Sequence, residues 1–299
     1  MDLTAFEQDT TVNCVLEGAV PARCKEEPCC LGIDEAGRGP VLGPMVYGVC
    51  YSPVSLKDEI VKMGLADSKT LTEDQREAIF KKIDDADDCI GWIVDVLSPN
   101  YISNSMLRRC KYNLNELSHD TAIGLIEKVL AKEVNLKEVF VDTVGDPDKY
   151  QAKLHKIFPD LEIVVAKKAD STYPIVGAAS ICAKVARDRS VRDWKFMEAV
   201  DVENYGSGYP GDPLTKKFMS DNIDAIFGYP QFVRFSWSTA AKLLDEKAVP
   251  VHWEDDDDDD VTPVNQPAIS AFFQSNSRPA VQKKHAYFQD KALTQMSTL

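Results

Sequence analysis

Two adjacent carboxylates, Asp34 and Glu35, stand at the end of a short apolar run that predicts a buried strand. A tight turn with Gly37, Arg38 and Gly39 follows them directly. Adjacent acids cost free energy unless a cation or a proton offsets their repulsion. Glycines beside them let a ligand approach the backbone closely. The stretch therefore predicts a site for metal ions and a phosphate group.

Two further acids follow predicted strands. Asp142 comes directly after an apolar run at residues 136–141, and Asp170 lies four residues beyond a run that ends at residue 166. In an open α/β sheet, ligands bind at the carboxyl ends of the strands, so parallel strands would bring all four acids together. Four carboxylates without a histidine suit Mg²⁺ or Mn²⁺ and not Zn²⁺.

Each acid, taken singly, also fits a purely structural role. Asp34 and Glu35 fit a simple turn before a glycine. Asp142 fits a turn or helix cap, and Asp170 stands where a helix N-cap belongs. Their agreement on one edge of one sheet is what favours the metal site.

The elements that must position these acids are predicted by hydrophobic periodicity. The predicted strands cover residues 29–33, 41–51, 90–97, 136–141 and 161–166, and the longer predicted helices cover residues 72–83, 113–132, 173–199, 214–226 and 238–247. The first two strands have hairpin-like spacing, and the last two alternate with helices. The fold class is therefore α/β, with a mixed five-stranded sheet flanked by helices.

The chain divides into four predicted parts. They are an irregular lead-in (1–27), a catalytic domain (28–200), a helical C-terminal extension (201–253) and an acidic linker with a flexible tail (254–299). Six consecutive aspartates at residues 255–260 repel each other and predict a solvated linker.

The composition indicates in which compartment the protein is expected and which binding partners it suits. The net charge of −14 over 299 residues argues against indiscriminate binding to nucleic acid, yet residues 167–195 carry seven basic residues against three acids. Such a local basic face can still bind a polyanion. No run approaches the roughly 18 apolar residues that span a bilayer, and no secretory signal is expected. The eight cysteines are expected to be reduced and mostly in the core, in a cytosolic or nuclear protein.

Several motifs together resemble the type 2 ribonucleases H, most closely the eukaryotic form. The motifs are DEAGRGP at 34–40, DSK at 67–69, VDT at 141–143, AD at 169–170, AASICAKVARD at 178–188, YGSGYP at 205–210 and PQFVRFSW at 230–237. The resemblance runs from about residue 28 to about residue 247. It implies a ribonuclease H-like fold and a metal-dependent endonuclease, which cuts the RNA strand of RNA/DNA hybrids and cuts 5′ of single ribonucleotides in duplex DNA.

The resemblance also implies roles for particular residues. The metal-binding and catalytic acids map onto Asp34, Glu35, Asp142 and Asp170. The residues that map onto substrate contacts are Gly37, Arg38 and Gly39 at the ribose 2′-hydroxyl, Tyr209 at the junction, and Lys69, Ser180, Lys184 and Arg187. Without the family, Lys69 and the basic residues near 184–195 also fit a solvated surface, and Tyr209 fits loop packing.

The residues and the family together give one mechanism. Two Mg²⁺ ions about 4 Å apart clamp the scissile phosphate, with Mn²⁺ as an alternative metal, and leave a 3′-hydroxyl and a 5′-phosphate. Because only the 2′-hydroxyl distinguishes RNA from DNA locally, a close backbone turn beside the acids would supply the specificity. The family implies accessory subunits B and C in a heterotrimer, a nuclear location, and roles in ribonucleotide removal and RNA primer removal.

Two other interpretations remain open. A phosphotransferase of the actin and sugar-kinase type shares a related sheet, but would need further phosphate loops rich in glycine and threonine. A catalytically inactive nucleic-acid-binding scaffold would be indicated by a missing acid, and all four acids are present.

The tail carries a separate pattern, Q-x-x-I-x-x-F-F, formed by Gln266, Ile269, Phe272 and Phe273. It resembles a peptide that binds the sliding clamp PCNA. A short helical turn would place the three apolar side chains on one side, with the glutamine at the rim. The alternative is that these side chains dock on the accessory subunits.

Overall fold

A computed structural model describes residues 1–64, 71–110, 112–143, 145–198, 200, 202 and 204–250. The predicted acidic linker and tail, and the DSK motif, lie outside these residues. No helix within the described part of the chain is both long enough and apolar enough to cross a membrane.

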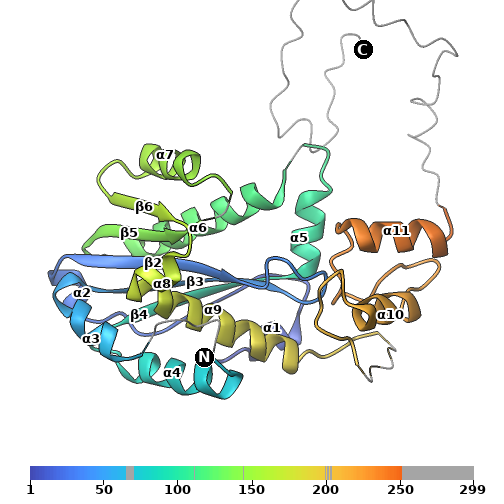
Figure 1. Cartoon of the computed structure of the whole chain (residues 1–299), viewed down its shortest axis with the longest axis horizontal. Coiled ribbons are helices and arrows are strands. Elements are labelled where there is room, and N and C mark those ends of the chain that lie inside the picture. Colours follow the sequence, from blue (N-terminus) through green and yellow to red (C-terminus); the bar gives the residue numbers. More distant parts are fainter. Residues whose placement is uncertain are drawn as a thin grey trace, which may run out of the picture.

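The centre of the fold is a mixed sheet of six strands in the order β1-β4-β3-β2-β5-β6 (Figure 1). The strands are β1 (Cys14–Glu17), β2 (Cys29–Ala36), β3 (Met45–Pro53), β4 (Gly91–Leu97), β5 (Leu136–Asp142) and β6 (Glu162–Ala166). The strands from β1 through β4, β3 and β2 pair antiparallel, whereas β2, β5 and β6 are parallel. The predicted hairpin and the predicted parallel strands are both confirmed.

The prediction of five strands and of an irregular lead-in was wrong. The lead-in contains α1 (Thr4–Gln8), β1 and α2 (Arg23–Glu26). The strand β1 has only four residues, too few to show a period of their own, and it forms by pairing with β4. The backbone N–H of Gly18 continues that pairing with the carbonyl of Trp92 at 2.9 Å.

Helices cover both faces of the sheet (Figure 1). One core cluster joins the sheet to α6 (Leu114–Ala131) and α7 (Pro147–Ile157), and a second joins it to α4 (Glu73–Asp85) and α9 (Pro174–Arg192). The remaining small elements are α3 (Lys57–Lys62) with the 3₁₀ turn η1 (Val54–Leu56), α5 (Pro99–Met106) and α8 (Ala169–Thr172). The predicted sheet with helices on its faces is thus confirmed.

Close packing of α9 on the sheet depends on small residues. The backbone carbonyl of Ala179 lies so near Gly48 of β3 that a β-carbon there would be 2.6 Å away from it. The small residues at 177–180 of this helix allow such an approach. As a result, the side chains of α9 that follow Ala179 come close to the acids on β2.

The C-terminal extension consists of α10 (Pro213–Asp221) and α11 (Ser238–Lys247) around a small core of their own. Phe218 and Phe232 of this core pack with Val41 and Leu42, which belong to the β2–β3 connection. The extension is therefore attached to the loop that follows the first two acids.

Asp95 of β4 gives a pH-dependent prediction that is independent of any activity. Burial raises its carboxyl pKa from 3.8 to about 6, and Lys128 offsets only part of this effect. Its Oδ1 has no hydrogen-bond partner among the described residues. A raised folded-state pKa means that stability is lost as the pH rises from about 4 to 6. Asp95→Asn should therefore add up to about 3 kcal/mol at pH 7.5 and little at pH 4.

Urea unfolding at both pH values checks this prediction. An equal effect of Asp95→Asn at pH 4 and pH 7.5 would show that ionisation of this carboxyl is not the cause.

Candidate active site

Asp34 and Asp142 lie side by side where the parallel strands β2 and β5 stop pairing. In the register of β2 and β5, Ile33 lies opposite Val141, so Asp34 and Asp142 are the next residues on the two strands. Asp34 is 5% exposed. The strand β2 continues past this point because it keeps pairing with β3, and Glu35 lies opposite Tyr47. Asp34 and Glu35 thus lie within β2. The apolar run had instead predicted that they follow the end of the strand.

Asp170 is attached to the same edge through the backbone. It lies in α8, directly after β6, and is 4% exposed. The N–H of Ala169 donates to Oδ1 of Asp142 at 2.9 Å, which fixes the start of α8 beside the end of β5. Residues from three parallel strands or their following turns are therefore brought to one edge.

Asp34 lies in an environment that strongly disfavours its charged form. Burial is the main cause that raises its carboxyl pKa to about 6, and the negative charge of Asp142 adds to it. A hydrogen bond with Ser180 and the charge of Lys184 oppose the shift. Nζ of Lys184 also donates to Oγ of Ser180 at 2.6 Å. The helix α9 therefore places the hydroxyl of Ser180 and the ammonium group of Lys184 beside Asp34.

Glu35 is flanked by buried phenols. Burial is the main cause that raises the pKa of Tyr47 and of Tyr150, and the charge of Glu35 adds to both shifts. The two tyrosines therefore stay neutral beside this carboxylate. They close the site on the α6 side of the sheet, where Tyr150 also stacks on His119.

The donor set fits a hard divalent cation, since it consists of carboxylates on one sheet edge. Within the part of the chain that the structure describes, no three His, Cys, Asp or Glu side chains form a ready-made cluster for a metal ion. Like charges held on separate elements repel each other when no cation lies between them. The structure shows an electrostatic interaction between Asp34 and Asp142, and the four-acid assignment stays a prediction.

The glycine loop (residues 37–39) follows directly. Gly37 has φ +75°, and a β-carbon on it would lie 2.0 Å from Nε of Arg187 and 2.9 Å from the carbonyl oxygen of Pro44. The Arg38 side chain donates to Ser118 and to Asn115, both on α6. The loop is therefore fitted against α9 on one side and against α6 on the other.

Arg234 binds the backbone of this loop, a role that the sequence analysis did not predict. The side chain is fully buried and donates to the carbonyls of Gly37 at 2.7 Å, Arg38 at 3.1 Å and Gly43 at 2.8 Å. Burial, together with the charges of Arg187 and Arg38, lowers the pKa of Arg234 well below its usual value. A guanidinium that binds three backbone carbonyls fixes the course of the loop.

Arg187 and Tyr209 lie on the open side of the glycine loop. Arg187 is largely enclosed, and burial lowers the pKa of its guanidinium. Its Nε has no hydrogen-bond partner among the described residues. The ring of Tyr209 lies beside Gly39, where a β-carbon would be 3.1 Å from Cε1, and Tyr209 is 54% exposed. The glycine loop thus presents bare backbone between a buried cation and an exposed aromatic ring.

Three of the seven basic residues predicted to form a basic face in 167–195 are ion-paired within the chain. Arg189 binds Glu77 at 2.5 Å, Arg192 binds Glu73 at 3.0 Å, and Lys195 binds Glu7 at 2.7 Å. These acids come from α4 and α1, which pack beside α9, so the sequence window alone could not reveal them. Lys184 and Arg187, in contrast, face the site.

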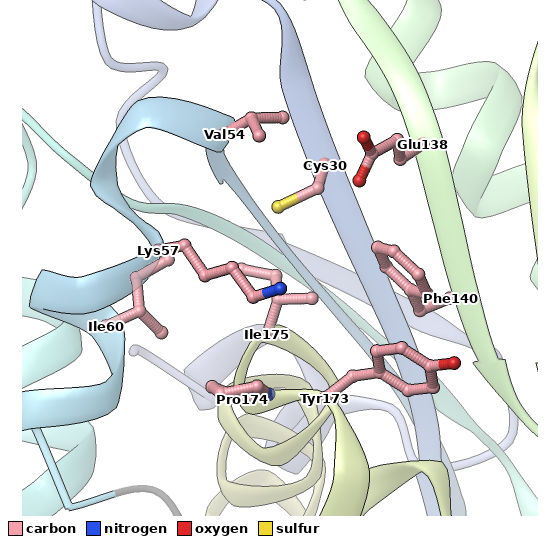
Figure 2. A pocket seen from close by; sticks show the side chains of 9 residues that line it. All are labelled: Cys30, Val54, Lys57, Ile60, Glu138, Phe140, Tyr173, Pro174 and Ile175. Carbon is pink, nitrogen blue, oxygen red and sulfur yellow. The ribbon is translucent and has the colours of Figure 1, made fainter.

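The cavity in Figure 2 is separate from the acids. It has a volume of about 140 Å³ and is lined by residues that include Cys30, Glu138 and Tyr173. Cys30 and Glu138 each precede an acid of the site by four residues, which is about 13 Å along a strand. The rings of Phe140 and Tyr173 stack at 4.3 Å beside it. This cavity is therefore not part of the candidate active site.

Lys69 and the tail residues Gln266, Ile269, Phe272 and Phe273 lie outside the described residues. Their predicted roles stay predictions.

Two solved structures share this architecture. The ribonuclease H2 from Pyrococcus horikoshii OT3 matches with a TM-score of 0.61 and 31% sequence identity, over 73% of this chain and 98% of that chain. The ribonuclease HII from Archaeoglobus fulgidus, solved in complex with PCNA, matches with a TM-score of 0.58 and 29% identity, over 76% of this chain and 99% of that chain. The class is therefore that of α/β proteins with a ribonuclease H-like fold.

Sequence comparison narrows this class to a family. The family model described as Ribonuclease HII matches residues 31–240. The A subunit of ribonuclease H2 from Homo sapiens is 50% identical over 301 residues, with 100% of each chain covered. Its counterpart in Arabidopsis thaliana is 50% identical over 236 residues, covering 78% of this chain and 79% of the other. The chain belongs to the ribonuclease HII family, and it is an endonuclease of the ribonuclease H type.

Proposed function

We propose that this chain is the catalytic subunit of a heterotrimer that cuts the RNA strand of RNA/DNA hybrids and incises 5′ of single ribonucleotides in duplex DNA. The observation that carries the proposal is the glycine loop, which places bare backbone directly beside the close carboxylate pair Asp34 and Asp142. A loop in that position can hydrogen-bond a ribose 2′-hydroxyl while the adjacent phosphate faces the acids.

The residues that would hold divalent metal ions are Asp34, Glu35, Asp142 and Asp170. Mg²⁺, or Mn²⁺ in its place, would supply charge neutralisation at the scissile phosphate and lower the pKa of the attacking water, with two ions per site. Burial and the charge of Asp142 raise the pKa of Asp34, and a cation bound there would lower it again by favouring the ionised carboxylate.

Other residues of the chain orient the Asp34 carboxylate and the glycine loop. Lys184 and Ser180 hold the carboxylate of Asp34 in place from α9. Arg234 holds the carbonyls of the glycine loop, which aims the loop's remaining polar groups outward. Cleavage in this geometry would leave a 3′-hydroxyl and a 5′-phosphate.

A cleavage assay tests the proposal directly. Its substrates are a duplex with one ribonucleotide, a long RNA/DNA hybrid and an all-DNA duplex, each with Mg²⁺ and with EDTA. We expect both ribose-containing substrates to be cut only with metal, and the DNA duplex to stay intact. Product ends of the opposite polarity, or cleavage of the DNA duplex, would overturn the assignment.

Tyr209→Ala should reduce cleavage at a lone ribonucleotide more than cleavage of a long hybrid. The exposed ring beside Gly39 is placed to stack on a sugar at an RNA–DNA junction, and a long hybrid offers many other cleavage positions. Single-turnover rates on both substrates measure the difference. Tyr209→Phe keeps the ring and serves as the control, with rates close to wild type. Equal losses on both substrates would mean that Tyr209 only supports its loop.

We infer accessory subunits B and C as partners, because the full-length relatives are described as the A subunit of ribonuclease H2. A nuclear location and roles in removing ribonucleotides and RNA primers from DNA follow from the proposed substrates.

The sliding clamp is a further proposed partner, through Gln266, Ile269, Phe272 and Phe273. The structure of an archaeal ribonuclease HII with PCNA supports the pairing of such enzymes with a clamp. A peptide of residues 262–278 should bind the clamp with micromolar affinity, and replacing both phenylalanines by alanine should abolish binding. Absence of binding by calorimetry at a clamp concentration of roughly 100 μM, far above that affinity, would rule the motif out.

A further inference from the structure

A groove of about 380 Å³ opens beside the glycine loop, on the side away from α9. Its lining comes from the glycine loop, the end of α5, and the starts of α6 and α11: Arg38, Gly39, Met106, Leu114, Ser236, Trp237 and Ser238. The helices α5 and α11, whose ends line the groove, are neighbours in Figure 1, and a contact of Ser236 with Ser103 and Met106 ties the two parts together. The volume is in the ~300–1,000 Å³ range of ligand sites.

Trp237 is the largest side chain of the groove, and its ring is fixed from two directions. Its Nε1 donates to the carbonyl of Gly39 at 3.3 Å. The guanidinium carbon of Arg234 lies 5.0 Å from the ring centroid, which fits a cation–π contact on one face. A ring held at its edge and on one face is a rigid platform for whatever enters the groove.

The rest of the lining specifies the chemistry of the occupant. Met106 and Leu114 supply apolar surface, and Arg38 supplies the one charge among the lining residues, a positive one. An aromatic platform with a neighbouring cation and no acid suits a base stacked beside its phosphate. Arg38 and Gly39 belong to both the groove and the glycine loop, so the groove continues the proposed ribonucleotide site without a break.

We propose that this groove is a nucleotide subsite, in which one base near the recognised ribonucleotide stacks on Trp237 while its phosphate lies near Arg38. The inference rests on the proposed substrate and names a second contact that would help to seat it. It predicts that the affinity for the duplex depends on the presence of a base at one particular position.

Binding without divalent metal tests this inference apart from catalysis. Labelled duplexes with one ribonucleotide carry a single abasic residue, moved through each position near the ribonucleotide on either strand. Fluorescence anisotropy with the full-length chain gives the dissociation constants. For wild type we expect an abasic residue to weaken binding about tenfold at one position, in line with base–aromatic stacking. Trp237→Leu should bind the intact duplex about tenfold more weakly than wild type. An abasic residue at the sensitive position should not weaken its binding any further.

Two further variants separate stacking from support of the loop. Trp237→Phe keeps a ring but loses the bond to Gly39, and it should retain the abasic-sensitive position. Leu114→Trp adds bulk to the groove from the start of α6 and leaves Trp237 itself unchanged, and it should both weaken binding about tenfold and abolish that sensitivity. Leu114→Trp also decides the matter if Trp237→Leu fails to fold.

The inference is overturned if no abasic position weakens binding by wild type, or if Leu114→Trp binds as tightly as wild type. It is also overturned if the loss of affinity from Trp237→Leu and the loss from the abasic residue multiply at every position. Cleavage by wild type in Mg²⁺ is scored separately. Its failure would count against the proposed function, whereas the groove is judged on the binding data alone.

Discussion

Asp34→Asn should lower the cleavage rate at least a thousandfold while the fold remains intact. Asp34 lies on a central strand, in close electrostatic contact with Asp142 at the proposed metal edge. Loss of a metal ligand removes several kcal/mol of transition-state stabilisation, and about 1.4 kcal/mol corresponds to each factor of ten. Single-turnover cleavage of a duplex with one ribonucleotide, in Mg²⁺, measures the loss.

The same substitution should stabilise the protein in EDTA. The folded-state pKa of Asp34 is raised from 3.8 to about 6, chiefly by burial. Ionisation of this carboxyl therefore destabilises the folded wild-type protein as the pH rises from about 4 to 6. Asparagine does not ionise, so the variant avoids that loss. We expect a gain of up to about 3 kcal/mol at pH 7.5 and almost none at pH 4.

Asp95→Asn is the matched control for both effects. Burial raises the pKa of Asp95 to about 6 as well, but Asp95 lies on β4, two strands from Glu35 in the same cross-strand row, and none of the four acids contributes to its shift. It should give a similar gain in stability with an unchanged cleavage rate. If Asp34→Asn kept more than about a tenth of the wild-type rate, the assignment of Asp34 as a metal ligand would be wrong.

Gly37→Ala should have the second largest effect, a loss of about a hundredfold in kcat/KM. The added β-carbon would meet Nε of Arg187 at 2.0 Å and the carbonyl of Pro44 at 2.9 Å, and the backbone φ of +75° is itself unfavourable for alanine. The loop must shift, and because it lies beside Glu35 the seating of the ribose shifts with it. Steady-state kinetics on the single-ribonucleotide duplex measure the change.

Gly64→Ala separates backbone strain from the clash. Gly64 has φ +79°, but no atom of the residues that the structure describes lies within 4 Å of an added β-carbon. This variant should lose only the left-handed backbone cost of about 1–2 kcal/mol in stability and keep its activity. If Gly37→Ala were as active as Gly64→Ala, close fitting of the glycine loop against Arg187 would not matter for the reaction.

The sequence alone located the acid edge because strand ends are local features. The apolar run before Asp34 and the run before Asp142 each marked a strand, and parallel pairing then followed from the alternation of strands with helices. The capped start of α6 was equally predictable, and the structure shows a capping box between Asn113 and Glu116. These features depend on a few consecutive residues, so one sequence suffices to find them.

Features that depend on distant partners could not be found in this way. Arg234 stands between Val233 and Phe235, and only folding shows that its acceptors are the carbonyls of residues 37, 38 and 43. The strand β1 exists because β4 pairs with it. Likewise, Arg189 looked available to a polyanion until α4 brought Glu77 to it.

The bond from Arg234 to the carbonyl of Gly37 spans 197 residues of sequence, which has a consequence for biosynthesis. At a translation rate of about 5–20 residues per second, the glycine loop emerges roughly 10–40 s before the side chain that holds it. A nascent or truncated chain that ends before the extension would contain all four acids but lack this contact. The loop beside the candidate metal edge therefore reaches its final support only when nearly the whole described part of the chain has been synthesised.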